Sequence, residues 1–334
     1  MLWFAGYPAR QTKRGDKYMK KINVLVTGLA LIASGSAVAG MPTIKTQIRG
    51  DLIRSDVEGA NEGTSFQVPY MRFDIKGKIT NDLSYRLKFR LNKTLAQEDD
   101  DGTGKGVDYA YIQKKFDNGL KVKLGKQYIN LGGYESIFSS RDTYSQGSLT
   151  WENASFYRNA VGVFYNMGGH SFNLQVANNK EEDRSENLLY GAQAILSFVD
   201  GMINPLVSYH ADTTHNDIAV GLQVKASALT VEVDRVITQH DDTDTGAKVD
   251  DDNSSTVFVK YKQGKWSPQL RYTVADGEVY KDFDSYHAAL EYYPYGNSSL
   301  RYHVAYAKVD NIKDDATSTK EESKTLTVGF ALSF

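Results

Sequence analysis

The sequence predicts an all-β fold: a 16-stranded antiparallel transmembrane β-barrel with short periplasmic turns and long extracellular loops. Three observations predict it. Apolar and polar residues alternate along many short segments, short and long connections alternate between these segments, and no apolar run is long enough for a membrane-spanning helix. Such a helix needs about 20 apolar residues, whereas a barrel strand needs only a short alternating segment.

The N-terminal region has the pattern of a secretory signal peptide. Lys20 and Lys21 precede an apolar stretch over 24–32, and residues 37–39 form an A-x-A cleavage site. A basic region, a short apolar region and small residues at the cleavage site are typical of export signals. The sequence therefore predicts a signal peptide over 1–39.

The rest of the chain, 40–334, is predicted to form the barrel domain. Met19 stands directly before the basic region, so we expect residues 1–18 to be an upstream extension. After removal of the signal peptide, acidic residues outnumber basic ones, which excludes general binding of nucleic acid. The chain has no cysteine, so its fold does not depend on disulfides.

The segment 83–91 shows the alternation most clearly. Its odd positions are all large and apolar, and three of its four even positions are basic, namely Arg86, Lys88 and Arg90. A period of two places the two sets on opposite faces of a strand. Since a basic residue facing lipid at mid-membrane costs about 2–4 kcal/mol, we expect the basic face to line the lumen.

The same alternation recurs along the chain and predicts sixteen strands. They span 43–54, 67–79, 83–95, 107–116, 120–129, 157–166, 171–179, 188–198, 203–212, 217–226, 228–238, 254–263, 266–276, 285–293, 299–309 and 324–334. In strands 217–226, 266–276 and 299–309 the outward set is aliphatic or aromatic and the inward set is polar or small. A filled hydrophobic core would need large aliphatic residues on the inward face, so this pattern favours a hollow interior.

The connections sort by length. Short turns rich in Gly, Asn and Asp lie at 80–82, 117–119, 167–170, 264–265 and 294–298. Longer, mostly acidic loops lie at 55–66, 96–106, 128–156, 180–187, 239–253, 277–284 and 310–323. Short turns at one end, long loops at the other and an even strand number are the layout of a bacterial outer-membrane barrel. We therefore predict the cell outer membrane as the location, with membrane lipid and lipopolysaccharide as partners.

The chain ends on an amphipathic strand over 324–334. Its apolar face consists of Leu326, Val328, Phe330, Leu332 and Phe334. This strand resembles the C-terminal signature of outer-membrane proteins, which implies recognition of Phe334 by the barrel-assembly machinery.

No catalytic or cofactor site is expected. The six histidines, at positions 170, 210, 215, 240, 287 and 303, do not have the spacing of metal ligands, and no G-x-S-x-G motif is present. The sequence therefore predicts a protein that is not an enzyme and that needs no cofactor or metal.

Residues 108–112 (DYAYI) and 119–127 (GLKVKLGKQ) resemble the pre-constriction region of the phosphate/polyphosphate-selective porin family. The resemblance implies a homotrimer that forms a passive, water-filled channel for small hydrophilic solutes and ions, with a preference for anions. Arg72, Arg86, Arg90 and Lys123 are the positions that the family pattern marks for the pore. The loop at 128–156 has no lysine, which favours a general diffusion channel over a phosphate-specific one.

In trimeric 16-stranded porins the third extracellular loop folds into the barrel and constricts it. By this resemblance, the loop at 128–156 is expected to form the constriction with Glu135, Arg141 and Asp142, the alternative being an ordinary surface loop. A basic wall is expected opposite the loop. It comprises Arg49, Arg72, Arg86, Lys88, Arg90, Lys121, Lys123, Arg271 and Arg301. Guanidinium groups keep their charge and would bind passing anions. The alternative is that these basic residues form mutually neutralising ion pairs with acidic residues inside the lumen and have no role in transport.

Two other functions remain open from the sequence. One is a selective phosphate or anion channel. The other is a barrel that serves as an adhesin or phage receptor through its acidic loops, and single-channel recording would distinguish it from a pore.

Overall fold

The computed structural model describes residues 40–57, 62–93, 104–139, 141–144, 157–178, 188–211, 215–240, 251–277, 281–297, 299–312 and 320–334. The expected signal peptide and upstream extension, residues 1–39, lie outside the described residues.

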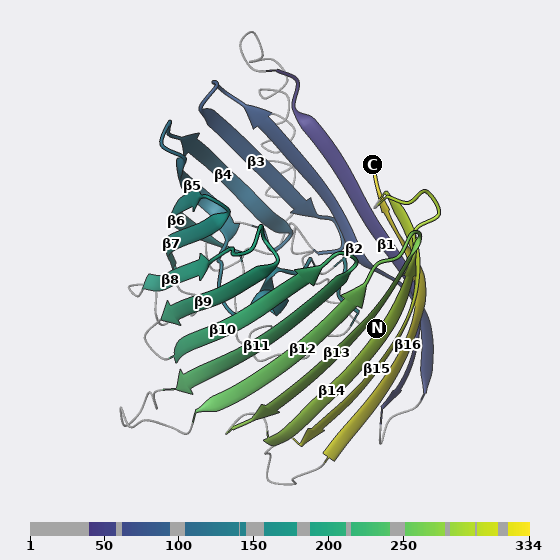
Figure 1. The fold of residues 1–334 in the computed structure, drawn as a ribbon. Helices are drawn as coiled ribbons and strands as arrows, with labels where there is room; N and C mark the ends of the chain where they lie inside the picture. The colour runs from purple at the N-terminus through teal and green to yellow at the C-terminus, as the bar shows by residue number, and fades with distance from the viewer. Residues whose placement is uncertain are drawn as a thin grey trace, which may run out of the picture.

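The described chain forms a closed antiparallel barrel in which each strand pairs with its neighbours in sequence and β1 pairs with β16 (Figure 1). The strands are β1 (Thr43–Val57), β2 (Gly63–Lys78), β3 (Leu83–Arg90), β4 (Val107–Lys115), β5 (Leu120–Tyr128), β6 (Tyr157–Met167), β7 (His170–Asn178), β8 (Leu188–Ile195), β9 (Ile203–Ala211), β10 (His215–Ala226), β11 (Leu229–His240), β12 (Asp252–Tyr261), β13 (Trp266–Asp276), β14 (Lys281–Tyr292), β15 (Leu300–Ile312) and β16 (Lys320–Ser333). The predicted fold class is confirmed.

Burial alternates along the strands as the sequence predicts. On β13, Leu270 and Tyr272 are exposed on the outer surface, whereas the alternating Arg271 and Thr273 are buried. The buried inward side chains of the barrel are largely polar or charged. An inward face of this kind needs water or ion-pair partners, which distinguishes this barrel from one filled by aliphatic side chains.

Several strand ends differ from the prediction. β1 and β2 pair as far as Ser55 and Gly63, and β16 begins at Lys320, so parts of the predicted loops 55–66 and 310–323 are strand. Strand pairing continues into these predicted loops because backbone hydrogen bonds between strands do not depend on apolar side chains. In contrast, β3 ends at Arg90, before the predicted end at residue 95, and the ladder is irregular where Lys88 and Phe89 face β4.

The chain terminus completes the closure of the barrel. Phe334 donates its backbone N–H to the carbonyl of Thr46 at 3.0 Å and accepts from the N–H of Thr46 at 2.7 Å. One short 3₁₀ helix, η1 (Tyr134–Ile137), follows β5. Among the described residues, no helix has the length and apolar character to cross a membrane.

Exposed aromatic side chains lie at several levels along the strands. Tyr261, Trp266, Tyr295 and Tyr302 lie toward the short turns, Tyr190 and Tyr209 lie toward the long loops, and Tyr272, Tyr286 and Tyr306 lie near the middle of their strands. Tyrosine and tryptophan rings prefer the membrane–water interfaces, so the rings near the strand ends suit a barrel that faces lipid.

Candidate functional site

The chain that follows β5 enters the barrel. We call the described residues 129–139 and 141–144 the inner loop. Ile129 and Leu131 are fully buried and pack against inward residues Ala160 of β6, Ala177 of β7 and Leu189 of β8. The small side chains of Ala160 and Ala177 leave space for the two aliphatic residues, so the first part of the inner loop lies against the inner surface of the barrel.

The next part of the inner loop approaches β10 and β11 very closely. A Cβ atom on Gly221 of β10 would lie 2.4 Å from Oδ1 of Asp234 and 3.1 Å from Cδ2 of Tyr134. A Cβ atom on Gly133 would lie 2.4 Å from Cγ of Asp234. Since real Cβ atoms do not approach so closely, both positions need glycine for the loop to sit against the strands.

Backbone and side-chain hydrogen bonds fix this contact. The backbone N–H of Glu135 donates to Oδ2 of Asp234 at 3.0 Å, and the hydroxyl of Tyr134 donates to the carbonyl of Asn204 at 2.7 Å. The carboxylate of Glu135 lies 3.3 Å from Nη1 of Arg271 on β13. Both of these charged side chains are buried, so the Glu135 charge is neutralised where it enters the lumen.

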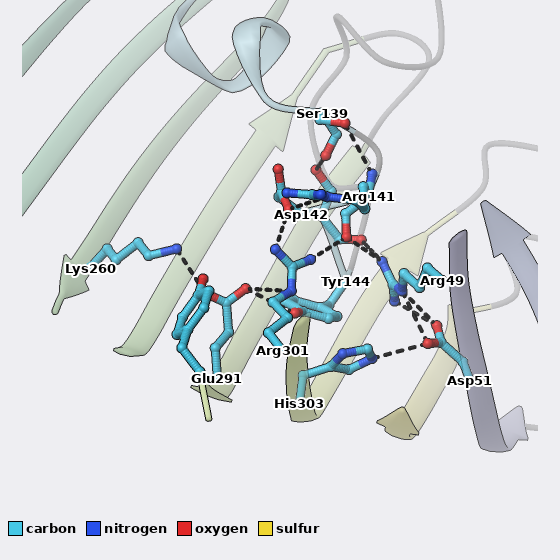
Figure 2. Close-up of polar contacts among 12 residues, drawn as sticks. Arg49, Asp51, Ser139, Arg141, Asp142, Tyr144, Lys260, Glu291, Arg301 and His303 are labelled. Atoms are coloured by element: carbon cyan, nitrogen blue, oxygen red, sulfur yellow. Dashed lines mark hydrogen bonds and ion pairs between the residues drawn. The ribbon is translucent and has the colours of Figure 1, made fainter. Parts of the chain in front are cut away.

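The second part of the inner loop is bound by two arginines (Figure 2). Arg49 of β1 donates to the carbonyl of Thr143 at 2.6 Å and also pairs with Asp51 at 2.7 Å. Arg301 of β15 donates to the carboxylate of Asp142 and to the carbonyl of Arg141. Each guanidinium offers several donors, which lets one side chain hold both a carboxylate and the loop backbone.

Tyr144 anchors the end of the described inner loop. Its ring lies against the rings of His303 and His287, at centroid distances of 4.7 and 5.7 Å. Its hydroxyl donates to Oε1 of Glu291 at 2.9 Å, and Lys260 of β12 holds Oε2 of the same carboxylate at 2.9 Å (Figure 2). Burial raises the pKa of the Tyr144 hydroxyl, so it remains protonated and able to donate.

The charge on Asp142 is favoured by its surroundings. Burial by itself raises the pKa of this carboxyl, but the charges of Arg301 and Arg141 and their hydrogen bonds outweigh that effect, and the pKa lies below its ordinary value. The loop carboxylate therefore stays ionised and paired over the neutral pH range.

A second group of cations lies on β2, β3 and β5. We call it the cationic wall, and it consists of Arg72, Arg86, Lys88, Arg90, Lys121 and Lys123. Two carboxylates pair with its arginines. Asp108 lies 3.1 Å from Arg72 and 2.7 Å from Arg90, and Asp74 lies 2.6 Å from Arg86.

The lysines of the cationic wall have no carboxylate within ion-pair distance in the part of the chain that the structure describes. Lys88 lies 5.4 Å from the ring centroid of Tyr109, and Lys123 lies 3.8 Å from that of Phe164. The guanidinium of Arg86 lies over Tyr109 as well, at 4.3 Å. Aromatic faces attract these cations without cancelling their charge, so the wall keeps a positive surplus.

A family model described as phosphate-selective porin O and P matches residues 43–262. That range covers more than half of the chain. The chain belongs to this family.

Solved structures show the same fold. The porin is similar to an anion-selective porin from Comamonas acidovorans, with 12% identity, a TM-score of 0.67, and coverage of 89% of this chain and 100% of that one. It is also similar to the outer-membrane channel DcaP of Acinetobacter baumannii, with 11% identity, a TM-score of 0.67, and coverage of 90% and 98%. OmpT of Vibrio cholerae matches with 14% identity, a TM-score of 0.66, and coverage of 90% and 99%. No curated protein sequence matches.

Family and fold together establish an outer-membrane channel. Its described residues contain no group of three or more histidine, cysteine, aspartate or glutamate side chains that could hold a metal ion.

The structure separates the predicted basic wall of the porin into two groups. Arg49, Arg271 and Arg301 contact the inner loop itself, whereas Arg72, Arg86, Lys88, Arg90 and Lys123 of the cationic wall contact carboxylates or aromatic rings of the strands. Arg141 pairs with the adjacent Asp142 at 3.1 Å. The sequence analysis expects all nine cations opposite the loop. In the structure three of them contact the loop directly, and the other six form the cationic wall.

The sequence interpretation missed several contributors to this site. Tyr109 and Tyr111 are two positions apart on β4 and therefore share one face of the strand. This spacing could have placed both rings beside Arg86. Tyr144 and Gly221 carry no comparable signal, because their roles depend on contacts with strands far away in the sequence.

Proposed function

We propose that the inner loop constricts the channel of this porin and that anions pass between the loop and the cationic wall. The solutes are small and hydrophilic, and the flow through the water-filled lumen is passive. Glu135, Arg141 and Asp142 lie on the loop side of the passage, and Arg86, Lys88 and Lys123 lie on the wall side.

One observation carries this proposal: the distribution of contacts around the inner loop. Among the described residues, its hydrogen bonds reach β5, β7, β9, β11, β13, β14, β15 and β1, with one longer contact to Tyr70 of β2. No hydrogen bond or ion pair between described residues joins it to β4 or to β3, which carries three of the six residues of the cationic wall. This distribution supports a passage beside that sector of the barrel.

The charges on the two sides support an anion preference. On the loop side, Glu135 pairs with Arg271, and Asp142 pairs with Arg301 and Arg141, so the carboxylates are neutralised. The cationic wall has six cations and contacts the two carboxylates Asp74 and Asp108. A positive surplus in a narrow, low-dielectric passage attracts anions and repels cations.

Export and assembly complete the proposal. Residues 1–39 act as a signal peptide, with 1–18 as an upstream extension, and residues 40–334 form the inserted domain. Phe334 is read by the barrel-assembly machinery, and the outer surface contacts lipid and lipopolysaccharide. The porin is proposed to be a homotrimer, in support of which one OmpT structure is described as a trimer form.

Ion selectivity in planar bilayers tests the proposal. In a salt gradient, the wild-type porin is expected to give a reversal potential of the sign that indicates anion preference. The variant K88Q/K123Q removes two of the three lysine charges of the wall that lack carboxylate partners among the described residues, and it should lower the anion-to-cation permeability ratio severalfold. The variant R86Q/R90Q, which leaves Asp74 and Asp108 without these arginines, should move the ratio further toward cations.

The matched control is Lys114→Gln. Lys114 lies near a short turn and pairs with Asp82, away from the cationic wall. An unchanged reversal potential in both double variants would exclude the wall as the origin of selectivity, and a barrel that gives no stepwise conductance would exclude the channel itself.

Phosphate is the anion that the family description favours, whereas the absence of lysine from the loop 128–156 favours a general channel. Adding millimolar phosphate during chloride conduction distinguishes the two. A saturable block of chloride current indicates a phosphate site, and a simple additive current indicates general diffusion.

A further inference from the structure

The hairpin between β12 and β13 lies at the short-turn end of the barrel. β12 ends at Tyr261 and β13 begins at Trp266. The backbone N–H of Gln263 donates to the carbonyl of Trp266 at 2.9 Å, so Gly264 and Lys265 form the tip of the turn. Short turns of outer-membrane barrels face the periplasm. The outer surface beside this turn therefore faces the phospholipid leaflet of the outer membrane, whereas lipopolysaccharide occupies the leaflet at the long loops.

A pocket on the outer surface adjoins the turn, and we call it the turn pocket. It has a volume of about 740 Å³ and extends over β12, β13 and β14, which lie side by side in the barrel (Figure 1). Its apolar lining residues are Tyr261, Trp266, Pro268 and Leu290, and residues 263–265 of the turn complete it. Pro268 pairs with Leu290 across the β13–β14 ladder and has the smallest side chain of the four, so it forms the floor.

The turn pocket extends from the membrane interface into the apolar band. The ring of Trp266 packs on that of Tyr292, its register partner on β14, at a centroid distance of 4.6 Å. Tryptophan and tyrosine rings prefer the membrane–water interface, and these two lie at the ends of their strands. The next outward residues along β13, Pro268 and Leu270, are apolar. The turn therefore lies at the level of lipid headgroups, and Pro268 lies at the level of acyl chains.

The charge at the turn pocket is positive. Lys265 lines the pocket, and no carboxylate lies within ion-pair distance of it in the described part of the chain. The other lysine of this turn, Lys262, lies on the inner side, with its Nζ atom 4.9 Å from the ring centroid of the buried Tyr293. None of the described lining residues is acidic. An anionic headgroup would meet Lys265, whereas the ammonium group of a zwitterionic headgroup would find no carboxylate here.

We propose that the turn pocket binds an anionic glycerophospholipid of the phosphatidylglycerol class. The ammonium group of Lys265 binds the phosphodiester, and the indole N–H of Trp266 is a second donor at the same level. The side-chain amide of Gln263 accepts from a glycerol hydroxyl. One acyl chain lies over Pro268, between Tyr261 and Leu290. Charge complementarity and the position of the turn at the phospholipid leaflet select this occupant.

Lipid binding to the purified porin tests the proposal. The delipidated protein in neutral detergent is titrated with short-chain phosphatidylglycerol or phosphatidylethanolamine, and bound lipid is counted by native mass spectrometry. Phosphatidylglycerol is expected to bind about fivefold more tightly, which is the effect of one lysine at an anionic lipid surface. Soluble glycerophosphoglycerol, which has the same headgroup and no acyl chains, should compete weakly.

Variants separate the charge from the apolar groove. Lys265→Gln should weaken binding of phosphatidylglycerol about fivefold and remove its preference over phosphatidylethanolamine. Lys262→Gln is the matched control, because it removes the same charge from the inner side of the same turn and should leave binding unchanged. Pro268→Trp fills the floor of the pocket and should weaken binding of both lipids. The heat-dependent shift of the barrel on gels verifies that each variant is folded.

Four results would overturn the proposal. Equal affinity for phosphatidylglycerol in K265Q and the wild type would show that Lys265 does not bind the headgroup. An equal loss in K262Q and K265Q would show a general charge effect without a site. Full competition by soluble glycerophosphoglycerol would show that no lipid docking is needed. Dissociation of oligomers in P268W, measured in the same spectra, would show that a second copy of the chain covers this face instead.

Discussion

Arg271 on β13 lies 3.3 Å from the carboxylate of Glu135 in the inner loop, and 136 positions of sequence separate the two residues. Both side chains are buried inside the lumen. Their contact joins the loop that follows β5 to the far side of the barrel, and it neutralises a carboxylate that would otherwise carry an unpaired charge in the lumen. The stability of the loop and the charge balance of the lumen therefore depend on the same pair.

A double-mutant cycle measures this pair. Glu135→Gln leaves the buried Arg271 charge without this partner, and Arg271→Gln does the same to Glu135, so each single variant should be destabilised by about 3–5 kcal/mol. The variant E135Q/R271Q should recover part of that loss. The free energy of unfolding of the three variants is measured by urea titration, and the folded fraction at each urea concentration is read from the heat-dependent shift of the folded barrel on gels. Strictly additive losses would contradict a direct coupling between the two residues.

The close approach at Gly221 makes a prediction about conductance. Gly221→Val places a branched side chain where Asp234 and Tyr134 now lie, so the inner loop should move away from β10 and β11. Single-channel conductance should then rise and fluctuate more than in the wild type. Gly191→Ala is the matched control, because a Cβ atom there would meet the nearest inner-loop atom, Cγ2 of Ile129, at an ordinary 3.6 Å. A wild-type conductance in G221V would show that the loop does not set the size of the passage.

The ion pair between Asp142 and Arg301 makes the loop contact resistant to acid. Because the pKa of Asp142 lies below its ordinary value, the contact contributes stability above the unfolded pKa and loses it as the pH falls through the folded pKa. We therefore expect the contact between Asp142 and Arg301 to remain intact from about pH 7 to pH 5, so that Asp142 contributes no change in open-channel conductance within that range. Asp142→Asn should show the altered conductance already at neutral pH. A transition between pH 5 and 7 that D142N abolishes would contradict this assignment.

Gly125 has a backbone conformation that other residues rarely adopt. Its φ is +118°, and a Cβ atom there would lie 2.3 Å from the carbonyl oxygen of Ala110 on β4. We expect Gly125→Ala to destabilise the β4–β5 ladder by about 1–3 kcal/mol, because the clash is with backbone that cannot rotate away. Thermal unfolding of the purified barrel measures the loss. Gly40→Ala, where nothing lies within 4 Å, should be neutral, and an equal thermal midpoint for both variants would refute the clash.

The sequence by itself determined the barrel and the face of each strand. Along β3 and β13 the side chains alternate with a period of two. Turning the basic face toward lipid would cost several kcal/mol, so each strand can point only its apolar face toward the membrane. Alternating turn lengths then set the direction of the strands in the membrane. These are local properties, because each depends on residues that are neighbours along the chain.

Only the tertiary structure decided which cations face which partners. Arg49, Arg271 and Arg301 carry the same inward signal in the sequence as Arg86 and Lys88, yet the first three hold the inner loop and the last two lie on the cationic wall. The difference arises from barrel closure, which brings the residues after β5 against β9 to β15 and β1. Contacts across a lumen have no period along the chain, so alternation determines that a side chain points inward, and closure determines what it meets.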